Sequence, residues 1–382
     1  MLGGSIAWSV TKGGRHDTGA APTPMTTEGS ASPVSPSPSV SSGPLRTVTI
    51  AAVGDTMLGS TPVLPASPAT YLSAVRSALR APVTFGNLEG TLTDQTTSKC
   101  PTPSPTTPRP APSGSGRSPS PSPPPSCFAF RVPPSYATYF RQAGFTVMNH
   151  ANNHSLDFGY PGLEDTLAAL RAAHVANTGL PGQIAVVRRH GVRVAFVGFA
   201  PYAYTASMLN VPAARALIRT AAHEADLVVV YMHAGAEGAD QTHVTGREEV
   251  YDGEDRGNPR SFAHIAVDAG ADLVIASGPH VLRGMEFYRH RLIAYSLGNF
   301  AGYQDYSVDG VLGLSAVLRV TLAGDGSFVA ARLVPVRLAG AGQPVPDPSG
   351  AAIRQVATLS REDFGRRAAR ISARGMIGPP GP

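Results

Sequence analysis

The chain has 382 residues, a formal net charge of +5 and only two lysines among its 31 basic residues. It has no run of basic residues and no basic stripe interleaved with aromatic side chains, which excludes the usual pattern of a nucleic-acid-binding protein. Once the low-complexity stretches are set aside, residues 46–340 remain, which is the size of one large α/β domain.

The amino-terminal segment, residues 1–45, is predicted to be a disordered Pro/Ser/Thr-rich tether. Residues 21–44 are almost entirely Pro, Ser, Thr, Ala and Gly, a composition that buries too little apolar surface to offset its chain entropy. Residues 1–10 lack the length of a membrane span and the charged region of a signal peptide. They fit the end of a hydrophobic segment whose start is missing, through which we expect membrane association.

Predicted strands and helices alternate through residues 46–340, which indicates parallel βαβ units. Apolar stretches predict buried strands at 47–53, 83–88, 145–148, 227–232 and 273–276. Apolar spacing predicts helices at 71–79, 134–143, 162–173, 212–225 and 261–269. A mixed sheet, or two sheets packed face to face, is expected from the hairpin-like pairs in 185–200, 285–297 and 312–336. Residues 341–382 are Pro/Gly-rich and are expected to form a peripheral tail, with one predicted helix at 361–372.

Two cysteines, Cys100 and Cys127, flank a second low-complexity stretch at 101–126 that is predicted to be a disordered insert. They are either unrelated free thiols or a disulfide at the base of the insert. We favour the disulfide, because isolated cysteines are usually buried in apolar strands and these are not. Such a bridge would contribute about 3–4 kcal/mol. It would also indicate an oxidising location outside the cytoplasm, either the cell envelope or the extracellular space.

Polar side chains follow five of the predicted apolar strands. Each is a metal-ligand or acid–base type, and they are Asp55, Glu89, Asn153 with His154, His233 and His280. Such side chains bind divalent ions such as Mn²⁺, Fe²⁺, Zn²⁺ or Mg²⁺, and the carboxyl ends of neighbouring parallel strands converge. Any one of these residues has a structural explanation as a helix cap or a buried histidine, but the repetition predicts a polar, metal-binding cleft. Asp157 is expected to cap the helix that begins near Gly159.

Six segments together resemble the signature blocks of the bacterial capsule-synthesis CapA family, also called poly-γ-glutamate synthesis proteins. The segments are VGDTMLG at 53–59, GNLEGTL at 86–92, ANNHSLDFG at 151–159, HAGAE at 233–237, PHVL at 279–282 and YSLGNF at 295–300. The family is similar to the calcineurin-like metallophosphoesterases. The resemblance therefore implies an α/β fold with four layers, an α/β/β/α sandwich of metallophosphoesterase type with two mixed sheets between helical layers.

The resemblance also implies roles for individual residues. The implied metal ligands are Asp55, Glu89, Asn153, His233 and His280. His154 would be catalytic, because it matches the residue that hydrogen-bonds the substrate or protonates its leaving group. Cys100 and Cys127 stand where a cysteine pair occurs in some members of the family.

Two positions depart from the phosphoesterase pattern. Met57 stands where that pattern has a histidine, and Gly278 replaces the first of a pair of histidines. Each change removes one ligand from a different metal, and two-metal hydrolysis needs both ions about 4 Å apart. The departures favour a single-metal centre or a metal-free cleft.

Three functions stay open from the sequence. The first is support of the biosynthesis or export of an extracellular polymer such as poly-γ-glutamate, through binding of the anionic polymer or its synthesis machinery. The second is a metal-dependent hydrolase of a phosphoester or γ-glutamyl bond, and the third is a noncatalytic binding module. The residues expected to bind substrate or support the site are Asn87, Asp157, Glu237, Arg256, Arg260, Arg283 and Asn299. For each arginine, an exposed surface charge is an equally good interpretation.

Overall fold

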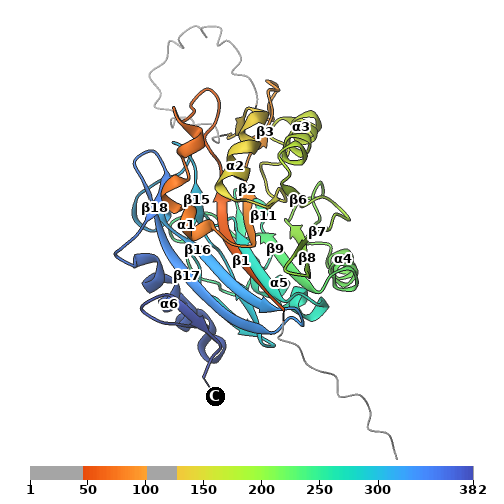
Figure 1. The fold of residues 1–382 in the computed structure, drawn as a ribbon, viewed down its shortest axis with the longest axis vertical. Helices are drawn as coiled ribbons and strands as arrows, with labels where there is room; N and C mark the ends of the chain where they lie inside the picture. Colours follow the sequence, from red (N-terminus) through yellow and green to blue (C-terminus); the bar gives the residue numbers. More distant parts are fainter. Residues whose placement is uncertain (1–45, 101–126, 382) are drawn as a thin grey trace, which may run out of the picture. The chain divides into compact units, whose positions relative to one another are not determined.

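The computed structural model describes residues 46–100 and 127–381, and Figure 1 shows their arrangement. The predicted tether at 1–45 and the predicted disordered insert at 101–126 lie outside the described residues. The described residues form two main β-sheets with helices packed on their outer faces.

The larger sheet has ten strands and is mixed in direction. Its path is β19-β20-β17-β16-β1-β2-β5-β6, with β15 beside β1 and β18 beside β17. β1, β2, β5 and β6 are parallel, whereas β16 is antiparallel to β1 and β17 is antiparallel to β16. The strands are β1 Thr47–Thr56, β2 Val83–Leu88, β5 Val147–Asn149, β6 Ala176–Thr178, β15 Asn299–Ala301, β16 Leu314–Ala323, β17 Phe328–Ala339, β18 Gln343–Pro346, β19 Arg370–Ile371 and β20 Met376–Gly378.

The smaller sheet has six strands in the order β13-β14-β12-β9-β8-β7. Its four central strands are parallel, and β7 and β13 pair antiparallel at the two edges. The strands are β7 Ala185–Arg189, β8 Val192–Phe199, β9 Leu227–His233, β12 Leu273–Ser277, β13 Met285–Tyr288 and β14 Arg291–Ala294. Two short pairs lie outside both sheets, namely β3 Thr91–Leu92 with β4 Arg131–Val132, and β10 Val250–Tyr251 with β11 Glu254–Asp255.

The alternation of side chains along β1 explains the layering. Ile50 faces the core between the two sheets, where it joins Val229 of the smaller sheet, whereas Ala51 and Val53 face the core beneath the helices. Because both faces of β1 are covered, its sequence is almost continuously apolar.

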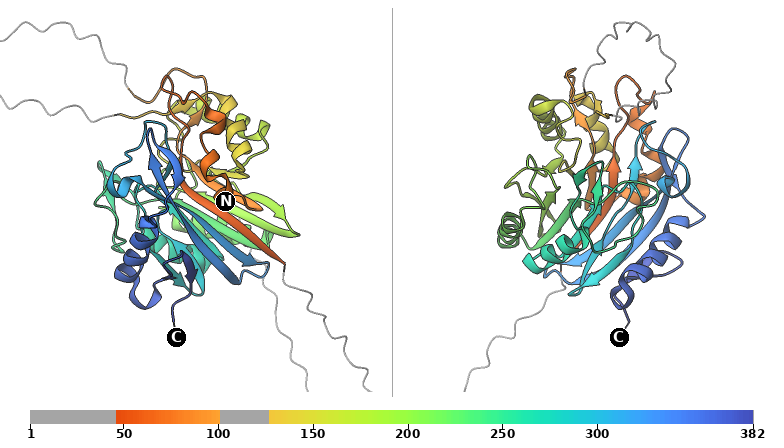
Figure 2. Two further views of the ribbon diagram at one scale, coloured as in Figure 1. Left: turned by 60° about the vertical axis from the view of Figure 1, so that its left-hand side comes forward. Right: turned by 180° about the vertical axis from the view of Figure 1, so that it is seen from behind.

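The helices form the two outer layers of the sandwich (Figure 2). The helices α2 and α3 cover the larger sheet, and α4 and α5 cover the smaller one. This arrangement confirms the predicted α/β/β/α sandwich with two mixed sheets between helical layers. These helices, with the short α1, are α1 Arg76–Leu79, α2 Ala137–Ala143, α3 Gly159–Ala172, α4 Val211–Glu224 and α5 Pro259–Ala269. None of the helices in the described part of the chain has the length and apolar character needed to cross a membrane.

The carboxyl-terminal segment differs from the peripheral tail predicted for 341–382. β18 and β20 both pair with β17, and helix α6 (Ala351–Phe364) contacts β13 of one sheet and β17 of the other. Its residues Ile353 and Val356 are buried in the core between the sheets. The helix also begins ten residues earlier than predicted. Its N-cap, Gly350, has no side-chain cap, and the carboxylate of Asp347 accepts the backbone N–H of Ala351 at its start. The Pro/Gly-rich composition concealed this amphipathic helix.

Candidate metal centre

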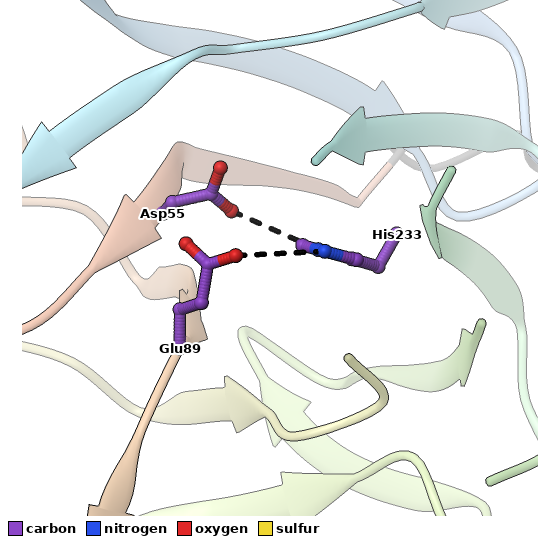
Figure 3. A group of neighbouring side chains, drawn as sticks. All are labelled: Asp55, Glu89 and His233. Carbon is purple, nitrogen blue, oxygen red and sulfur yellow. Dashed lines mark ion pairs between the residues drawn. The ribbon is translucent and has the colours of Figure 1, made fainter. Parts of the chain in front are cut away.

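Three buried side chains from both sheets meet at the ends of their strands. Asp55 is the penultimate residue of β1, Glu89 follows the neighbouring parallel strand β2, and His233 is the last residue of β9. Each offers one ligand atom, and these atoms lie within 4.8 Å of one another (Figure 3). His233 Nε2 is 3.5 Å from Glu89 Oε1, and His233 Nδ1 is 3.9 Å from Asp55 Oδ1. The convergence predicted from the strand ends is therefore present for these three residues.

The donor atoms of this group fit a divalent cation. Glu89 Oε1 and His233 Nε2 are buried and have no hydrogen-bond partner among the described residues. A buried polar atom without a partner is costly, and an ion bound between these two atoms would remove that cost. Two carboxylates and one imidazole are suitable ligands for Mn²⁺, Fe²⁺ or Zn²⁺.

The environment sets the charges of these side chains. Burial lowers the pKa of His233 to about 3, so its imidazole is neutral and keeps a lone pair for a metal. Burial also raises the pKa of the Glu89 carboxyl well above its usual value, and the nearby Asp55 charge raises it further. For Asp55, burial opposes the charged form, but the hydrogen bond and positive charge of His280 outweigh it and lower the pKa.

His280 lies beside the carboxylates instead of joining the three-residue group. Its Nδ1 is 2.8 Å from Asn299 Oδ1 and 3.3 Å from Asp55 Oδ2, and its Nε2 is 3.5 Å from Glu237 Oε2. Burial disfavours the charged ring, but the charge of Glu89 and the bonds to Asp55 and Glu237 raise the pKa of His280 well above its usual value. In this arrangement His280 is a cationic partner of the carboxylates, and Asn299 orients its ring as expected.

The two departures from the phosphoesterase pattern leave the group without two imidazoles. Met57 is buried with its sulfur against the backbone of Gly90. Gly278 contributes only its backbone N–H, which donates to Asp55 Oδ2 at 3.3 Å. The positive φ of Gly278, +119°, and its close approach to Ala234 both favour glycine at this position.

Tyr306 was not predicted as part of the site. Its hydroxyl donates to Glu89 Oε2 at 2.6 Å, and its ring centroid is 5.4 Å from that of His280. Of the two Glu89 oxygens, Oε1 is the one without a hydrogen-bond partner among the described residues. Tyr306 follows the YSLGNF block by six residues and lies in no predicted element, so the sequence offered no signal for it.

A group of asparagines holds the first carboxylate. Asn87 Nδ2 donates to Asp55 Oδ1 at 2.8 Å, as expected for a supporting residue, and it also lies 3.4 Å from His233 Nδ1. Asn87 Oδ1 in turn accepts from Nδ2 of Asn149 at 2.7 Å and of Asn152 at 3.0 Å. Neither Asn149 nor Asn152 was predicted. The adjacent pair of asparagines at 152–153 was the available signal, but the sequence does not say which one faces the site.

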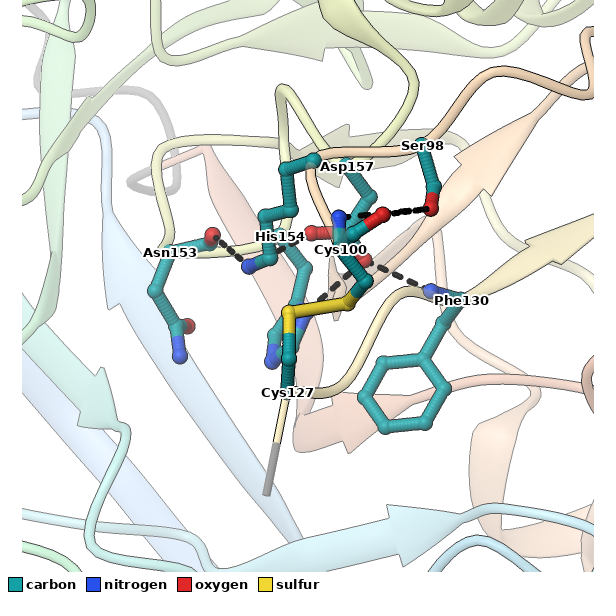
Figure 4. The surroundings of a disulfide bond; sticks show 8 residues. Ser98, Cys100, Cys127, Phe130, Asn153, His154 and Asp157 are labelled. Atoms are coloured by element: carbon teal, nitrogen blue, oxygen red, sulfur yellow. Dashed lines mark hydrogen bonds and ion pairs between the residues drawn. A yellow bond between two sulfur atoms is a disulfide. The ribbon is translucent and has the colours of Figure 1, made fainter. Parts of the chain in front are cut away.

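The loop after β5 carries the predicted catalytic histidine. His154 Nδ1 is 2.8 Å from Asp157 Oδ2, and its ring centroid is 4.6 Å from that of Phe130 (Figure 4). Asp157 does not cap the following helix, which corrects that expectation. Helix α3 begins at Gly159 with no side-chain cap, because the Asp157 carboxylate is occupied by His154 and by the backbone N–H of Phe130.

Asn153 stays a prediction as a metal ligand. Its side-chain Oδ1 is buried and has no hydrogen-bond partner among residues 46–100 and 127–381. Its backbone carbonyl accepts a hydrogen bond from Lys99 Nζ at 3.1 Å.

Arg283 forms an internal ion pair and presents no free guanidinium edge to a substrate. Its Nη1 and Nη2 donate to the two oxygens of Glu249 at 3.1 and 2.8 Å, and its Nε donates to the carbonyl of Gln241 at 2.7 Å. It is fully buried. The structure therefore places Arg283 in a bidentate pair that holds the loop after β9.

Arg256 is buried next to the candidate metal centre. Its Nη1 donates to Glu237 Oε1 at 2.7 Å, and Glu237 connects it to His280. Its Nε and Nη2 are buried and have no partner among the described residues. Arg260 instead lies over the ring of Phe364, 5.4 Å from its centroid, and takes no part in this cluster.

The structure joins Cys100 and Cys127 in a disulfide, which confirms the predicted bridge and excludes the free-thiol interpretation. The bridge lies beside the loop that carries His154 and Asp157 (Figure 4). It therefore belongs to the surroundings of the candidate site.

The two mixed sheets, their outer helices and the carboxylate–imidazole group at the strand ends define an α/β/β/α sandwich protein with a candidate metal centre between its sheets. Residues 49–304 match the family model for the bacterial capsule synthesis protein PGA_cap, and the chain belongs to this family. The matched region contains every predicted metal-ligating and catalytic residue and confirms the resemblance to CapA proteins.

Relatives of the chain carry capsule-related names. It is 33% identical over 188 residues to the capsule biosynthesis protein CapA of Bacillus anthracis, covering 44% of this chain and 42% of that one. It is 30% identical over 184 residues to the PGA biosynthesis protein CapA of Bacillus subtilis, covering 44% and 45%. The chain thus spans less than half the length of these curated relatives. A solved 5′-nucleotidase precursor from Thermus thermophilus aligns with 83% of this chain and 59% of its own, at 14% identity and a TM-score of 0.39.

Proposed function

We propose that this protein supports the synthesis or export of an anionic capsule polymer, such as poly-γ-glutamate, outside the cytoplasm. The observation that carries the proposal is the buried Asp55, Glu89 and His233 group, with two ligand atoms that lack partners among the described residues, in a chain of the capsule synthesis family. The disulfide supports the extracytoplasmic location, since disulfides persist in oxidising compartments.

The metal centre would hold one divalent ion, either Mn²⁺, Fe²⁺, Zn²⁺ or Mg²⁺. Asp55, Glu89 and His233 would be its protein ligands, and the bound ion would act as a Lewis acid toward a substrate oxygen. Asn87 would keep the Asp55 carboxylate in place through its 2.8 Å hydrogen bond, and Tyr306 would do the same for Glu89 at 2.6 Å.

The anionic substrate would be recognised by Arg256. Its Nε and Nη2 form one edge of the guanidinium, and their N–H groups can donate two parallel hydrogen bonds to a carboxylate. Both atoms are buried without a partner in the described part of the chain, so a carboxylate of the polymer would reach them only after the residues over Arg256 move. It would then compensate a charge that Glu237 only half satisfies.

A second candidate function is metal-dependent hydrolysis of a phosphoester or γ-glutamyl bond. The observation that favours it is the His154–Asp157 pair, in which Asp157 holds Nδ1 of the imidazole at 2.8 Å. Nε2 of His154 would then face the substrate and transfer a proton to the leaving group. In this function the same metal centre would stabilise the charge that develops on the substrate oxygen.

Polymer production tests the first function. A capsule-forming host that lacks its own CapA-family protein would be complemented with the full chain, with the Asp55→Asn/His154→Ala double variant, or with Arg193→Met as a surface control. We expect polymer with the full chain and the control, and none with the double variant. Full polymer production by the double variant would overturn a role for the site.

Metal analysis and a hydrolysis screen test the second function. Protein purified without chelators is expected to contain about one divalent ion per chain, and to turn over a phosphodiester or a γ-glutamyl amide. Loss of turnover in His154→Ala with the metal retained would assign the proton transfer to His154. Absence of turnover on both substrate classes, with polymer production intact, would leave only the first function.

A further inference from the structure

Asp157 is clamped from two sides by the chain segments that the disulfide joins. From one side, Lys99 Nζ forms an ion pair with Asp157 Oδ1 at 2.8 Å, and the Lys99 backbone N–H donates to the Asp157 carbonyl at 2.7 Å. From the other side, the backbone N–H of Phe130 donates to Asp157 Oδ2 at 2.6 Å. His154 shares Oδ2, so the same carboxylate that orients the imidazole is held by both segments.

The disulfide closes these two segments into one unit, which we call the clamp (residues 98–100 and 127–130). Lys99 directly precedes Cys100, and Phe130 follows Cys127 by three residues. Phe130 is also held by the pairing of β4 with β3, in which the Thr91 backbone N–H donates to the Phe130 carbonyl at 3.0 Å. Without the bridge, the Lys99 segment would lose its covalent link to this pair and would be followed only by the 26 residues of the Pro/Ser-rich insert at 101–126, so the disulfide chiefly keeps Lys99 beside Asp157.

The contacts of the clamp converge on the His154 loop. Lys99 Nζ also donates to the carbonyl of Asn153 at 3.1 Å. One ammonium therefore contacts Asn153, which precedes His154, and Asp157, which follows it by three residues. The ring of Phe130 packs on the imidazole with centroids 4.6 Å apart. Asp157 is fully buried, and a buried carboxylate needs compensating charge and hydrogen bonds to stay in place. Among the described residues, the Lys99 ammonium is the cation paired with it, and His154 Nδ1 contacts its other oxygen at 2.8 Å.

We propose that Lys99 is a positioning residue for His154, and that the Cys100–Cys127 disulfide holds it in this role. Lys99 and Phe130 fix the Asp157 carboxylate, Asp157 fixes Nδ1 of the imidazole, and the imidazole then presents Nε2 in one orientation. Reduction of the bridge frees the Lys99 segment from the segment that carries Phe130 and loosens the His154 corner of the site. The proposal deepens the proposed function, because it rests on His154 acting in the site.

The test compares four forms of the full chain: wild type, Lys99→Met, Lys99→Arg and the Cys100→Ser/Cys127→Ser double variant. Arg193→Met is the matched control, because Arg193 pairs with Asp226 at 2.9 Å and its side chain is 39% exposed, close to the 37% of Lys99. Amide hydrogen exchange over 153–159 reports the order of the loop. The ¹⁵N signals of His154 report whether Nδ1 keeps its proton, a signature that general destabilisation of the fold would not move.

We expect Lys99→Met and the double serine variant to speed exchange over 153–159 by about tenfold or more, and to convert the single Nδ1–H form of His154 into a tautomer mixture. Lys99→Arg is expected to restore most of both signals, and Arg193→Met to leave them unchanged. If the double variant does not fold, titrating the folded wild type with reductant gives the same comparison. Unchanged exchange and an unchanged His154 signal in Lys99→Met and in the reduced chain would overturn the proposal.

These outcomes separate the clamp from the proposed function. If His154→Ala leaves polymer production and turnover unchanged, the proposed role of His154 fails, whereas the exchange and ¹⁵N signals still show whether the clamp positions the ring. If His154→Ala abolishes function while Lys99→Met changes neither signal, only the clamp is overturned. Turnover of Lys99→Met is expected to fall in kcat more than it rises in KM, because the change affects orientation and not binding.

Discussion

The candidate site has two corners that are built in different ways. The metal corner, Asp55, Glu89 and His233, consists of side chains at or next to the ends of buried strands. The His154 corner, His154 and Asp157, lies on a loop held by contacts with Lys99 and Phe130. Sheet pairing fixes the first corner, whereas an ion pair, a ring contact and a disulfide fix the second. The difference teaches that one site can combine a ligand set fixed by sheet pairing with a histidine on a loop that lies beside a disulfide.

Removing the disulfide should give the largest difference between the two corners, with a loss of stability but no loss of metal. The Cys100→Ser/Cys127→Ser variant is expected to lose about 3–4 kcal/mol of unfolding free energy, because a bridge over this sequence separation restricts the unfolded chain. Urea unfolding measures the loss, and metal content measured on the folded fraction should stay at the wild-type level. Loss of metal in parallel with stability would show that the two corners are not independent.

Acidification should lower the free energy of unfolding through the buried side chain of His150. His150 follows β5 at the start of the His154 loop, and burial lowers its pKa to about 4 from an ordinary 6.5. The unfolded chain therefore binds the proton more readily, so stability is lost as the pH falls from about 6.5 to about 4, by about 3 kcal/mol at the lower limit.

The His150→Gln variant isolates this contribution, because it removes the titrating ring while other groups, His233 among them, continue to contribute. Its free energy of unfolding is expected to depend less steeply on pH between about 4 and 6.5. An equally steep dependence in wild type and variant would contradict the assignment to His150.

Glu89→Gln should damage only the metal corner. The amide keeps the shape of the side chain but loses the charge, and we expect metal affinity to fall by about 100-fold or more, since partners outside the ligand set alone change affinity by about 10- to 100-fold. Equilibrium dialysis with Mn²⁺ measures the effect, with the exposed Glu248→Gln as the control. The His154 tautomer signal should not change, and a change there would argue against separate corners.

Tyr306→Phe is expected to give the smallest effect. It removes the 2.6 Å hydrogen bond to Glu89 Oε2 and leaves the ring beside His280. Metal affinity should fall by about tenfold or less, again measured by dialysis. Tyr303→Phe, on the same loop, serves as the control. A larger loss than that of Glu89→Gln would mean that Tyr306 organises the whole corner.

The contrast between the corners also explains what could be predicted from sequence. Asp55, Glu89 and His233 were predictable because each follows an apolar strand, and strand ends meet at one edge of a sheet. The disulfide was predictable from the position of Cys100 and Cys127 around the insert. The sandwich architecture followed from the motif blocks, since periodicity alone left one mixed sheet or two as alternatives.

Other features depend on contacts between residues far apart in sequence. The distance from Tyr306 to Glu89 spans 217 positions, and from Lys99 to Asp157 it spans 58, so neither contact leaves a local pattern. Asp157 has the composition of a helix cap, and only the fold shows that His154 and Phe130 occupy its carboxylate instead. Arg283 and Arg256 could not be distinguished from sequence, because the pairing with Glu249 decides their roles.

The position of β16 shows how far along the chain a fragment must extend to fold on its own. The family match ends at residue 304, but β16 (Leu314–Ala323) pairs with β1 along most of its length, from Thr47 to Ala52. A fragment that stopped at the end of the match would turn β1, the strand that carries Asp55, into an open edge with unpaired backbone groups. Such an edge invites pairing between copies, so the fragment should aggregate instead of yielding a smaller active protein.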